Sequence, residues 1–150
     1  MPDGLDQGGV APALPETVLI VDDAEFRARQ IKHALRGPHR QVFTVPTARE
    51  ALASLTDALP DLIIVHMDLG DLSGTPLLST LRDRAPGIPV LALSADDSAA
   101  LGAAAAHAGA TDVLSLPINQ AALLRATSAA LSSSRGIRDL ERAREQVRDR

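Results

Sequence analysis

Three short runs of apolar residues without polar alternation most constrain the fold of this chain. They are VLIV at 18–21, LIIV at 62–65 and IPVLAL at 88–93. Such runs are typical of strands covered on both faces, and polar residues end each of them. The segments between them have helical patterns. The sequence therefore predicts parallel strands that alternate with helices.

Two further strands and five helices complete the predicted alternation. Residues 41–45 alternate with period two and end at Pro46, which favours a strand near a sheet edge, and residues 112–116 form the fifth predicted strand. In the first helix, Phe26 and Ile31 are expected on the apolar stripe. Helices are predicted at 24–36, from Thr47 to about Leu59, from Ser73 to Pro86, at 98–107 and from Asn119 onward. Short loops imply βαβ crossovers, so we expect an α/β fold with a doubly wound parallel sheet.

Local signals set several helix ends. Thr47 and Glu50 have the spacing of a capping box, in which the Thr hydroxyl accepts from the amide three residues on and the Glu side chain reaches back to the Thr. The run Asp96-Asp97-Ser98 is predicted to cap the alanine-rich helix, Gly109 is the predicted C-cap of that helix, and Asn119 is the predicted N-cap of the last one.

Composition narrows the classes of function. The chain has 150 residues, 45% of them hydrophobic, which suits one globular domain with tails. A net charge of -4 and only two aromatic residues argue against nucleic-acid binding. The absence of cysteine excludes thiolate metal sites and fits a reducing cytoplasm. No secretory signal and no apolar run of about 18 residues is present, so we expect a cytoplasmic protein away from membranes.

Polar residues follow the predicted strands at their carboxyl ends. In open parallel sheets the ligand site lies at this edge, so we expect these side chains to converge. They are Asp22 and Asp23 after the first strand, His66 and Asp68 after the third, Ser94 after the fourth, and Leu116 and Pro117 after the fifth.

The joint pattern resembles the receiver domain of two-component response regulators. It comprises VLIVDD, PDLII with a glycine-bounded loop (Gly70 to Gly74), IPVLALSA and DVLSLPI, over roughly Thr17 to Leu131. The resemblance implies a flavodoxin-like (βα)5 fold with strand order 2-1-3-4-5. In that family an acid pair holds Mg²⁺ and an Asp ending strand three accepts a phosphoryl group from a histidine kinase. A Ser or Thr ending strand four and a Lys before the strand-five Pro bind the phosphoryl group.

Some positions match that family and others depart from it. Asp22 and Asp23 match the acid pair, and Ser94 matches the hydroxyl position. His66 stands at the acceptor position and Leu116 at the lysine position.

The switch aromatic is also replaced, by Val113, and the chain contains neither Tyr nor Trp. The single lysine of the chain, Lys32, lies in the first predicted helix, so no shifted alignment recovers the missing ammonium. Phosphoryl transfer to a carboxylate needs a bridging Mg²⁺ and a cation for the developing charge. We therefore predict a receiver that is not an enzyme and acts without phosphorylation.

Four interpretations of the His66 pocket are open. In the first, His66 makes a hydrogen-bonded or ionic contact to Asp22 or Asp23, with no cofactor or with Mg²⁺ held weakly by that pair. In the second, Asp68 replaces the missing acceptor and joins the acid pair as a phosphorylatable or Mg²⁺-binding cluster. In the third, His66 and the acid pair bind a transition ion, which suits one imidazole and two carboxylates. In the fourth, Ser94, His66 and an Asp form a hydrolase triad.

The ends of the chain are predicted to differ from its middle. Residues 1–16 are Pro- and Gly-rich and are expected to be disordered, and residues 17–132 form the receiver-like domain. Residues 133–150 are expected to be a linker or a coiled-coil helix, because apolar residues recur at 3-4-3 spacing. We expect a homodimer through this last helix, and a protein partner such as a histidine kinase, an output domain or another regulator.

Overall fold

The computed structural model describes residues 15–148, with side chains described as far as Ser134. Five strands and five helices alternate along this described part of the chain, as predicted. They are β1 (Glu16–Val21), α1 (Glu25–Leu35), β2 (Arg40–Val45), α2 (Ala48–Asp57), β3 (Leu62–His66), α3 (Gly74–Arg84), β4 (Val90–Ser94), α4 (Ala99–Ala108), β5 (Asp112–Ser115) and α5 (Gln120–Arg148).

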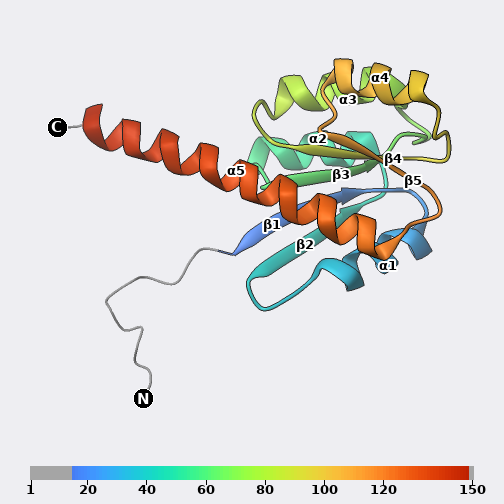
Figure 1. Ribbon diagram of the computed structural model, residues 1–150, viewed down its shortest axis with the longest axis horizontal. Coiled ribbons are helices and arrows are strands. Elements are labelled where there is room, and N and C mark those ends of the chain that lie inside the picture. Colours follow the sequence, from blue (N-terminus) through green and yellow to red (C-terminus); the bar gives the residue numbers. More distant parts are fainter. Residues whose placement is uncertain (1–14, 149–150) are drawn as a thin grey trace.

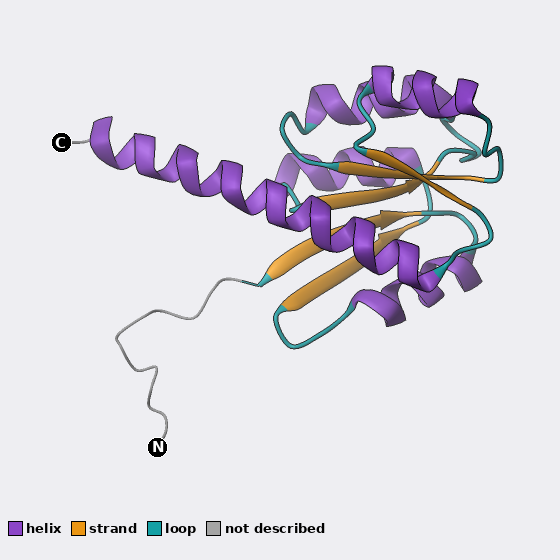
Figure 2. Ribbon diagram, viewed as in Figure 1, coloured by secondary structure: helices purple, strands orange, loops and turns teal. Residues whose placement is uncertain are grey.

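The strands form one parallel sheet with helices on both faces (Figure 2). Their order is β2-β1-β3-β4-β5, which confirms the predicted flavodoxin-like fold and strand order. The order reverses between β1 and β3, so the edge of the sheet above these two strands is the expected ligand position.

Two apolar cores lie on the two faces of the sheet. On one face, α1 and α5 cover alternate residues of β1 and β3, among them Ile20 and Ile64, which are fully buried. On the other face, α2, α3 and α4 cover the intervening residues, among them Val21 and Val65. The helices can be followed in Figure 1, with α3 and α4 together above the sheet and α5 crossing its opposite face. The central strands are therefore buried on both sides, as their unbroken apolar runs predict.

The register brings the strand ends to one level. Val21 of β1 lies beside Val65 of β3, and His66 lies beside Leu93 of β4. Asp22 therefore follows β1 at the height where His66 ends β3.

Predicted helix caps are present in the structure. The hydroxyls of Thr47 and Ser98 accept hydrogen bonds from amides three residues on, both at 3.1 Å. The side chain of Asn119 accepts from the amide of Ala122 at 3.0 Å. Gly109 ends α4 with a φ of 119°, which favours glycine. These four cap predictions are confirmed, while Glu50 accepts from the hydroxyl of Thr47 at 3.1 Å and not from its amide.

Phe26 is a correction to the predicted first helix. It was expected on the apolar stripe with Ile31, but its side chain is 79% exposed. Five residues separate the two positions, about 140° around a helix, so they cannot share a face. Ala28, Ile31 and Leu35 form the buried stripe instead. At the other boundaries, β1 begins at Glu16, the last residue of the predicted tail, and β4 begins two residues later than expected, at Val90.

The last helix is longer than its serine-rich middle suggests. It runs from Gln120 to Arg148 without interruption, and its C-terminal part extends past the sheet in Figure 1. Leu123 and Ala130, which have the phase of the predicted coiled-coil seam, are buried in the protein's own core. The part of that seam after residue 134, and the predicted tail before residue 15, lie outside the residues or side chains described. In the described part of the chain, no helix has the length and apolar character needed to cross a membrane.

Candidate functional site

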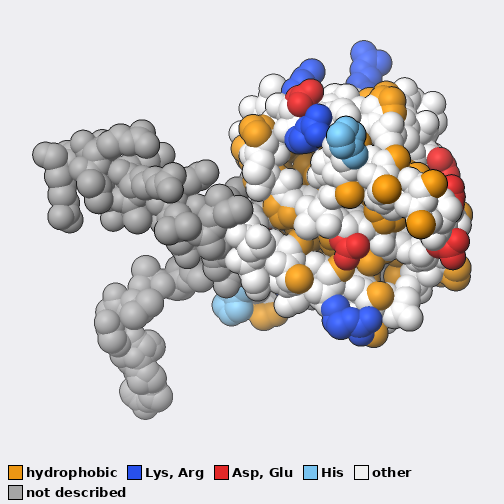
Figure 3. Space-filling model, turned by 45° about the horizontal axis from the view of Figure 1, so that its top comes forward, with side chains coloured by type: hydrophobic (Ala, Val, Ile, Leu, Met, Phe, Trp, Pro, Cys, Tyr) orange, Lys and Arg blue, Asp and Glu red, His pale blue; other side chains and the backbone are white. Residues whose placement is uncertain are grey.

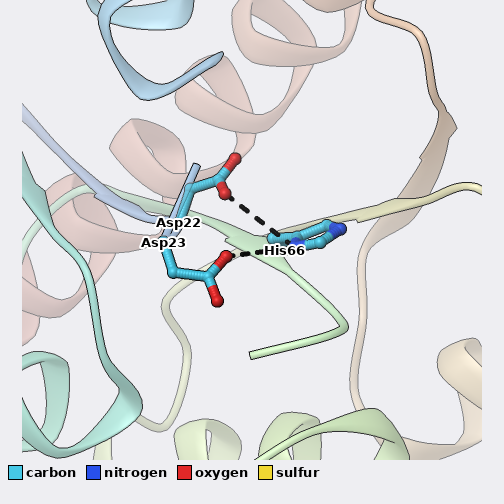
Figure 4. A group of neighbouring side chains, drawn as sticks. All are labelled: Asp22, Asp23 and His66. Atoms are coloured by element: carbon cyan, nitrogen blue, oxygen red, sulfur yellow. Dashed lines mark ion pairs between the residues drawn. The ribbon is translucent and has the colours of Figure 1, made fainter. Parts of the chain in front are cut away.

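The candidate site is a group of three side chains at the carboxyl edge of the sheet. Asp22 and Asp23 follow β1 directly, and His66 is the last residue of β3. One potential ligand atom from each lies within 4.8 Å of the other two. Figure 4 shows the imidazole pointing toward both carboxylates. The structure therefore brings together three of the residues singled out in the sequence.

The imidazole is close to both carboxylates without being hydrogen bonded to either. Nδ1 of His66 lies 3.8 Å from Oδ1 of Asp22 and 3.9 Å from Oδ1 of Asp23. These distances exceed those of a hydrogen bond and suit a loose ion pair when the imidazole is protonated. Nδ1 is buried and has no hydrogen-bond partner among the described residues. The expected contact is therefore ionic at most.

Arg27 is the partner that holds Asp22, and the sequence analysis missed it. From the first turn of α1 it donates from Nε to Oδ2 of Asp22 at 2.5 Å and from Nη2 to Oδ1 at 2.8 Å. The amide of Ala24 also donates to Oδ1, at 2.9 Å. Asp22 is 3% exposed, so this forked contact neutralises a buried carboxylate. The signal available in the sequence was an Arg in the first turn after the acid pair.

Ser94 lies at the same edge but takes part in a different contact. It is buried, and its hydroxyl oxygen accepts a hydrogen bond from the amide of Asp96 at 3.0 Å. The hydrogen bonds of the described residues include none between Ser94 and His66. A hydrolase triad requires that bond, so the geometry gives this interpretation no support.

The predicted switch positions contribute packing. Leu116 follows β5, donates its amide to the carbonyl of Ser94 at 2.9 Å, and packs against the core under α1 and α5. Val113 packs against the core on the opposite face. Pro117 is exposed and follows a cis peptide bond. The position expected for a lysine is thus held by an apolar side chain in contact with other apolar groups.

Asp68 lies outside the group formed by the acid pair and His66. It is exposed, between the buried residues Met67 and Leu69, which fix the loop after β3. The side chain beside the acid pair is that of His66, two residues before Asp68.

Asp71, in the same loop, has a role that the sequence analysis missed. It accepts hydrogen bonds from the amides of Ala48 at 3.1 Å and Arg49 at 2.9 Å, at the start of α2. These bonds, that of Arg49 first, lower the pKa of the Asp71 carboxyl from its ordinary value. The amide and hydroxyl of Ser98 likewise lower the pKa of Asp96. Both carboxylates hold loops at the edge where the site lies.

The surroundings of the site are acidic. In Figure 3 several Asp and Glu side chains lie along the right-hand margin, the side on which the strands of Figure 1 end. The exposed acids of this edge are Asp23, Asp68, Asp71, Asp96 and Asp97. Arg27 is the cation that contacts the site. The edge therefore attracts cations more than anions.

The donor set decides which ions the group can hold. A hard ion such as Mg²⁺ requires oxygen ligands in near-octahedral geometry. Here one of the three donors is an imidazole nitrogen, and the carboxylate of Asp22 already accepts three hydrogen bonds. The residues present do not fit Mg²⁺.

Comparisons with a family model and with curated sequences agree on one family. The model of the response regulator receiver domain family matches residues 18–128. TcrX of Mycobacterium tuberculosis, a probable transcriptional regulatory protein, is 34% identical over 109 residues, which are 73% of this chain and 47% of TcrX. The KDP operon transcriptional regulatory protein KdpE of Escherichia coli is 37% identical over 100 residues, 67% of this chain and 44% of KdpE. The chain spans about half the length of these curated relatives.

Solved structures agree with the sequence matches. The signal receiver domain of an HD domain-containing protein from Pseudomonas fluorescens superposes with a TM-score of 0.78 at 26% identity. The superposition covers 87% of this chain and 98% of that one.

Proposed function

This chain belongs to the response regulator receiver domain family of two-component signal transduction, and from that premise we propose that it signals through protein contacts without being phosphorylated. The observation that carries the proposal is His66. An imidazole stands at the end of β3, against Asp22 and Asp23, where the family has its acceptor carboxylate.

Two further features of the site support the proposal. Receiver domains bind Mg²⁺ at this acidic edge, but the nitrogen donor of His66 and the engaged carboxylate of Asp22 do not suit that ion. Leu116 supplies no cation for a phosphoryl oxygen, and the only lysine, Lys32, lies within α1. Each of these parts is needed for transfer to a carboxylate, and their losses coincide at one site.

The contact between Arg27 and Asp22 favours a site that stays in one conformation. Its guanidinium provides positive charge at Asp22, where other receivers place a metal ion, and it comes from the protein itself. A cation that is always present cannot report a phosphorylation event. The output then depends on binding partners and on the amount of protein.

Family membership and the long last helix suggest the partners. Response regulator receivers interact with histidine kinases and output domains, and we propose a contact of this kind in the cytoplasm, with α5 as a dimerising or linking element. Light scattering of the full chain against a version shortened after Ser134 tests this part. A full chain at twice the mass of one chain and a shortened protein at the mass of one shortened chain support dimerisation through α5, and the same number of subunits in both proteins contradicts it.

Incubation with Mg²⁺ and a small phosphodonor, followed by intact-mass measurement, tests the central proposal. We expect no labile mass gain in the natural protein. A labile gain that maps to Asp68 overturns the proposal in favour of a phosphorylatable receiver that uses Asp68 as its acceptor.

A matched variant shows that the assay can detect transfer. The double variant His66→Asp, Leu116→Lys restores the acceptor and the cation of the family, and we expect a labile gain that maps to position 66. The single variant Leu116→Lys keeps the imidazole and is expected to stay unmodified.

A further inference from the structure

β2 leaves one edge of the sheet free. It pairs with β1 alone among the described strands, and it is the lowest of the strands in Figure 1. The amide of Asp22 donates to the carbonyl of Val45, so every second residue of β2 directs its backbone groups toward β1. By the same alternation, Val42 and Thr44 direct their amides and carbonyls toward the free edge. A strand from another chain can pair with such groups.

A mainly apolar hollow adjoins this edge on the side of α2. Its volume is about 570 Å³, and Leu19, Phe43 and Leu59 are among the residues that line it. Phe43 is 54% exposed and Leu59 is 43% exposed, so apolar surface is open to a partner here. The charged residues of this hollow are Lys32 and Asp57.

A basic hollow adjoins the same edge on the side of α1. It also has a volume of about 570 Å³, and it is lined by Lys32, Arg36 and Arg40 but by no acidic residue. Arg40 is held by Glu16 at 3.2 Å. No ion pair of Lys32 or Arg36 occurs within the described part of the chain. This side of the edge therefore attracts anionic groups, although the chain as a whole is acidic.

We propose that the free edge of β2 binds an extended segment of a partner protein in which acidic and apolar residues alternate. The two hollows share lining residues of α1 and β2, so they are continuous around the edge. Successive side chains of a strand point to opposite faces of the sheet. An added strand thus directs its acidic side chains to Lys32 and Arg36, and its apolar side chains to Phe43 and Leu59. Bonds to the edge supply affinity, and the hollows supply specificity.

A second copy of this chain suits the edge less well than such a partner. Two β2 strands that pair antiparallel around a two-fold axis bring the same faces of both sheets together. Lys32 and Arg36 of one copy then lie near the same cations of the other, and like charges repel. The charge of the basic hollow therefore favours an acidic polypeptide.

Fluorescence anisotropy of the full-length chain with the labelled peptide Glu-Val-Glu-Leu-Glu-Val tests the proposal. We expect saturable binding that weakens as salt is raised, and no binding at similar concentrations of the same peptide with Lys in place of Glu. Hydrogen exchange of the Val42 and Thr44 amides should slow when the acidic peptide is bound, because both amides then donate to it.

Thr44 allows a matched pair of variants. Thr44→Pro removes the outward amide hydrogen, and proline is tolerated in edge strands, so the sheet should form while peptide binding weakens about tenfold. Thr44→Ala keeps that hydrogen and should bind the peptide as the natural protein does. Circular dichroism of both variants checks that they fold.

Reversal of one charge tests the basic hollow and serves if Thr44→Pro does not fold. Arg36→Glu changes an exposed residue of this hollow and should weaken binding of the acidic peptide about fivefold. The matched control is Arg84→Glu, which makes the same change at an exposed position of α3 outside both hollows. It should leave the affinity unchanged.

Several outcomes overturn the proposal. The absence of saturable binding, or equal affinity for the acidic and lysine peptides, excludes the stated partner. Unchanged affinity in Thr44→Pro and Arg36→Glu shows that the peptide binds elsewhere. Slow exchange of the Val42 and Thr44 amides without peptide assigns the edge to a second copy if it depends on protein concentration. It assigns the edge to residues 1–14 if it is lost when they are removed.

This surface goes beyond the proposed function, and the two fail separately. A natural protein that gains a labile phosphoryl group and still binds the acidic peptide overturns only the proposed function. A protein that stays unmodified and does not bind the peptide overturns only the role of the β2 edge.

Discussion

Asp22 and Asp71 lie at the same edge of the sheet, and each carboxylate is held by several donors, but their surroundings differ. Asp22 is buried, and a guanidinium and one amide hold it. Asp71 is exposed, and two amides at the start of α2 hold it. One carboxylate belongs to the candidate site, and the other fastens the loop after β3.

The difference shows how burial sets the importance of a contact. A buried charge that loses its partner cannot regain water, so breaking such a pair costs several kcal/mol. An exposed carboxylate that loses its amides is solvated at once, and the amides are solvated too. We therefore expect Arg27 to dominate the stability of this edge, and Asp71 to act locally on one loop and one helix end.

Arg27→Met should have the largest effect. It leaves the Asp22 carboxylate buried without its cation, and we expect the free energy of unfolding to fall by about 3 kcal/mol. Urea denaturation followed by circular dichroism measures the change. The control is Arg29→Met, which breaks the exposed Arg29–Glu25 pair of the same helix and should cost no more than about 0.5 kcal/mol.

A double variant checks the cause of that loss. Asp22→Asn combined with Arg27→Met removes the unpaired charge and should recover part of the stability. Equal losses in Arg27→Met and Arg29→Met contradict the importance given to burial.

Asp71→Ala should have a smaller effect, confined to one region. It removes the acceptors of the Ala48 and Arg49 amides, so hydrogen exchange of these two amides should accelerate. The urea midpoint should fall less than in Arg27→Met. Asp68→Ala, in the same loop and also exposed, is the control and should leave α2 unchanged. Slower or unaltered exchange at both amides refutes the role of Asp71.

Acid should produce the smallest effect. Because the pKa of Asp71 is lowered in the folded protein, its carboxylate contributes stability that is fully present above its unfolded-state pKa of about 3.9. That stability fades as the pH falls through the lower, folded-state pKa. The difference in urea midpoint between the natural protein and Asp71→Asn should therefore shrink below about pH 4.

Asp96→Asn is the comparison for the acid series. The pKa of Asp96 is also lowered, by the amide and hydroxyl of Ser98, so the sign of its effect is the same. A difference for Asp71→Asn that grows toward low pH contradicts the assigned cause.

Local sequence patterns predicted correctly the features that depend on one segment alone. The apolar runs at β1, β3 and β4 gave the buried strands, and the caps at Thr47, Ser98 and Asn119 formed as predicted. It was wrong at Phe26, because an apolar residue was assigned to a stripe without its helical phase. Phe26 and Ile31 are five positions apart, a spacing that places their side chains on different sides of a helix.

Contacts between segments were beyond the reach of local patterns. Arg27 could be suspected from its place after the acid pair, but its forked bond to Asp22 depends on how α1 packs against β1. The bonds from Ala48 and Arg49 to Asp71 join residues 22 and 23 positions apart. No pattern within one segment indicates them.

The sequence by itself determined the alternation of strands and helices and the presence of the acid pair after the first strand, of His66 at the end of the third and of Leu116 after the fifth. Only the tertiary structure decided that Asp22 is held by Arg27, that Nδ1 of His66 is buried without a partner, and that Asp68 lies outside the site. The physical reason is that residue types fix which chemistry is possible, whereas burial and distance, which arise only when strands and helices pack, decide which charges meet.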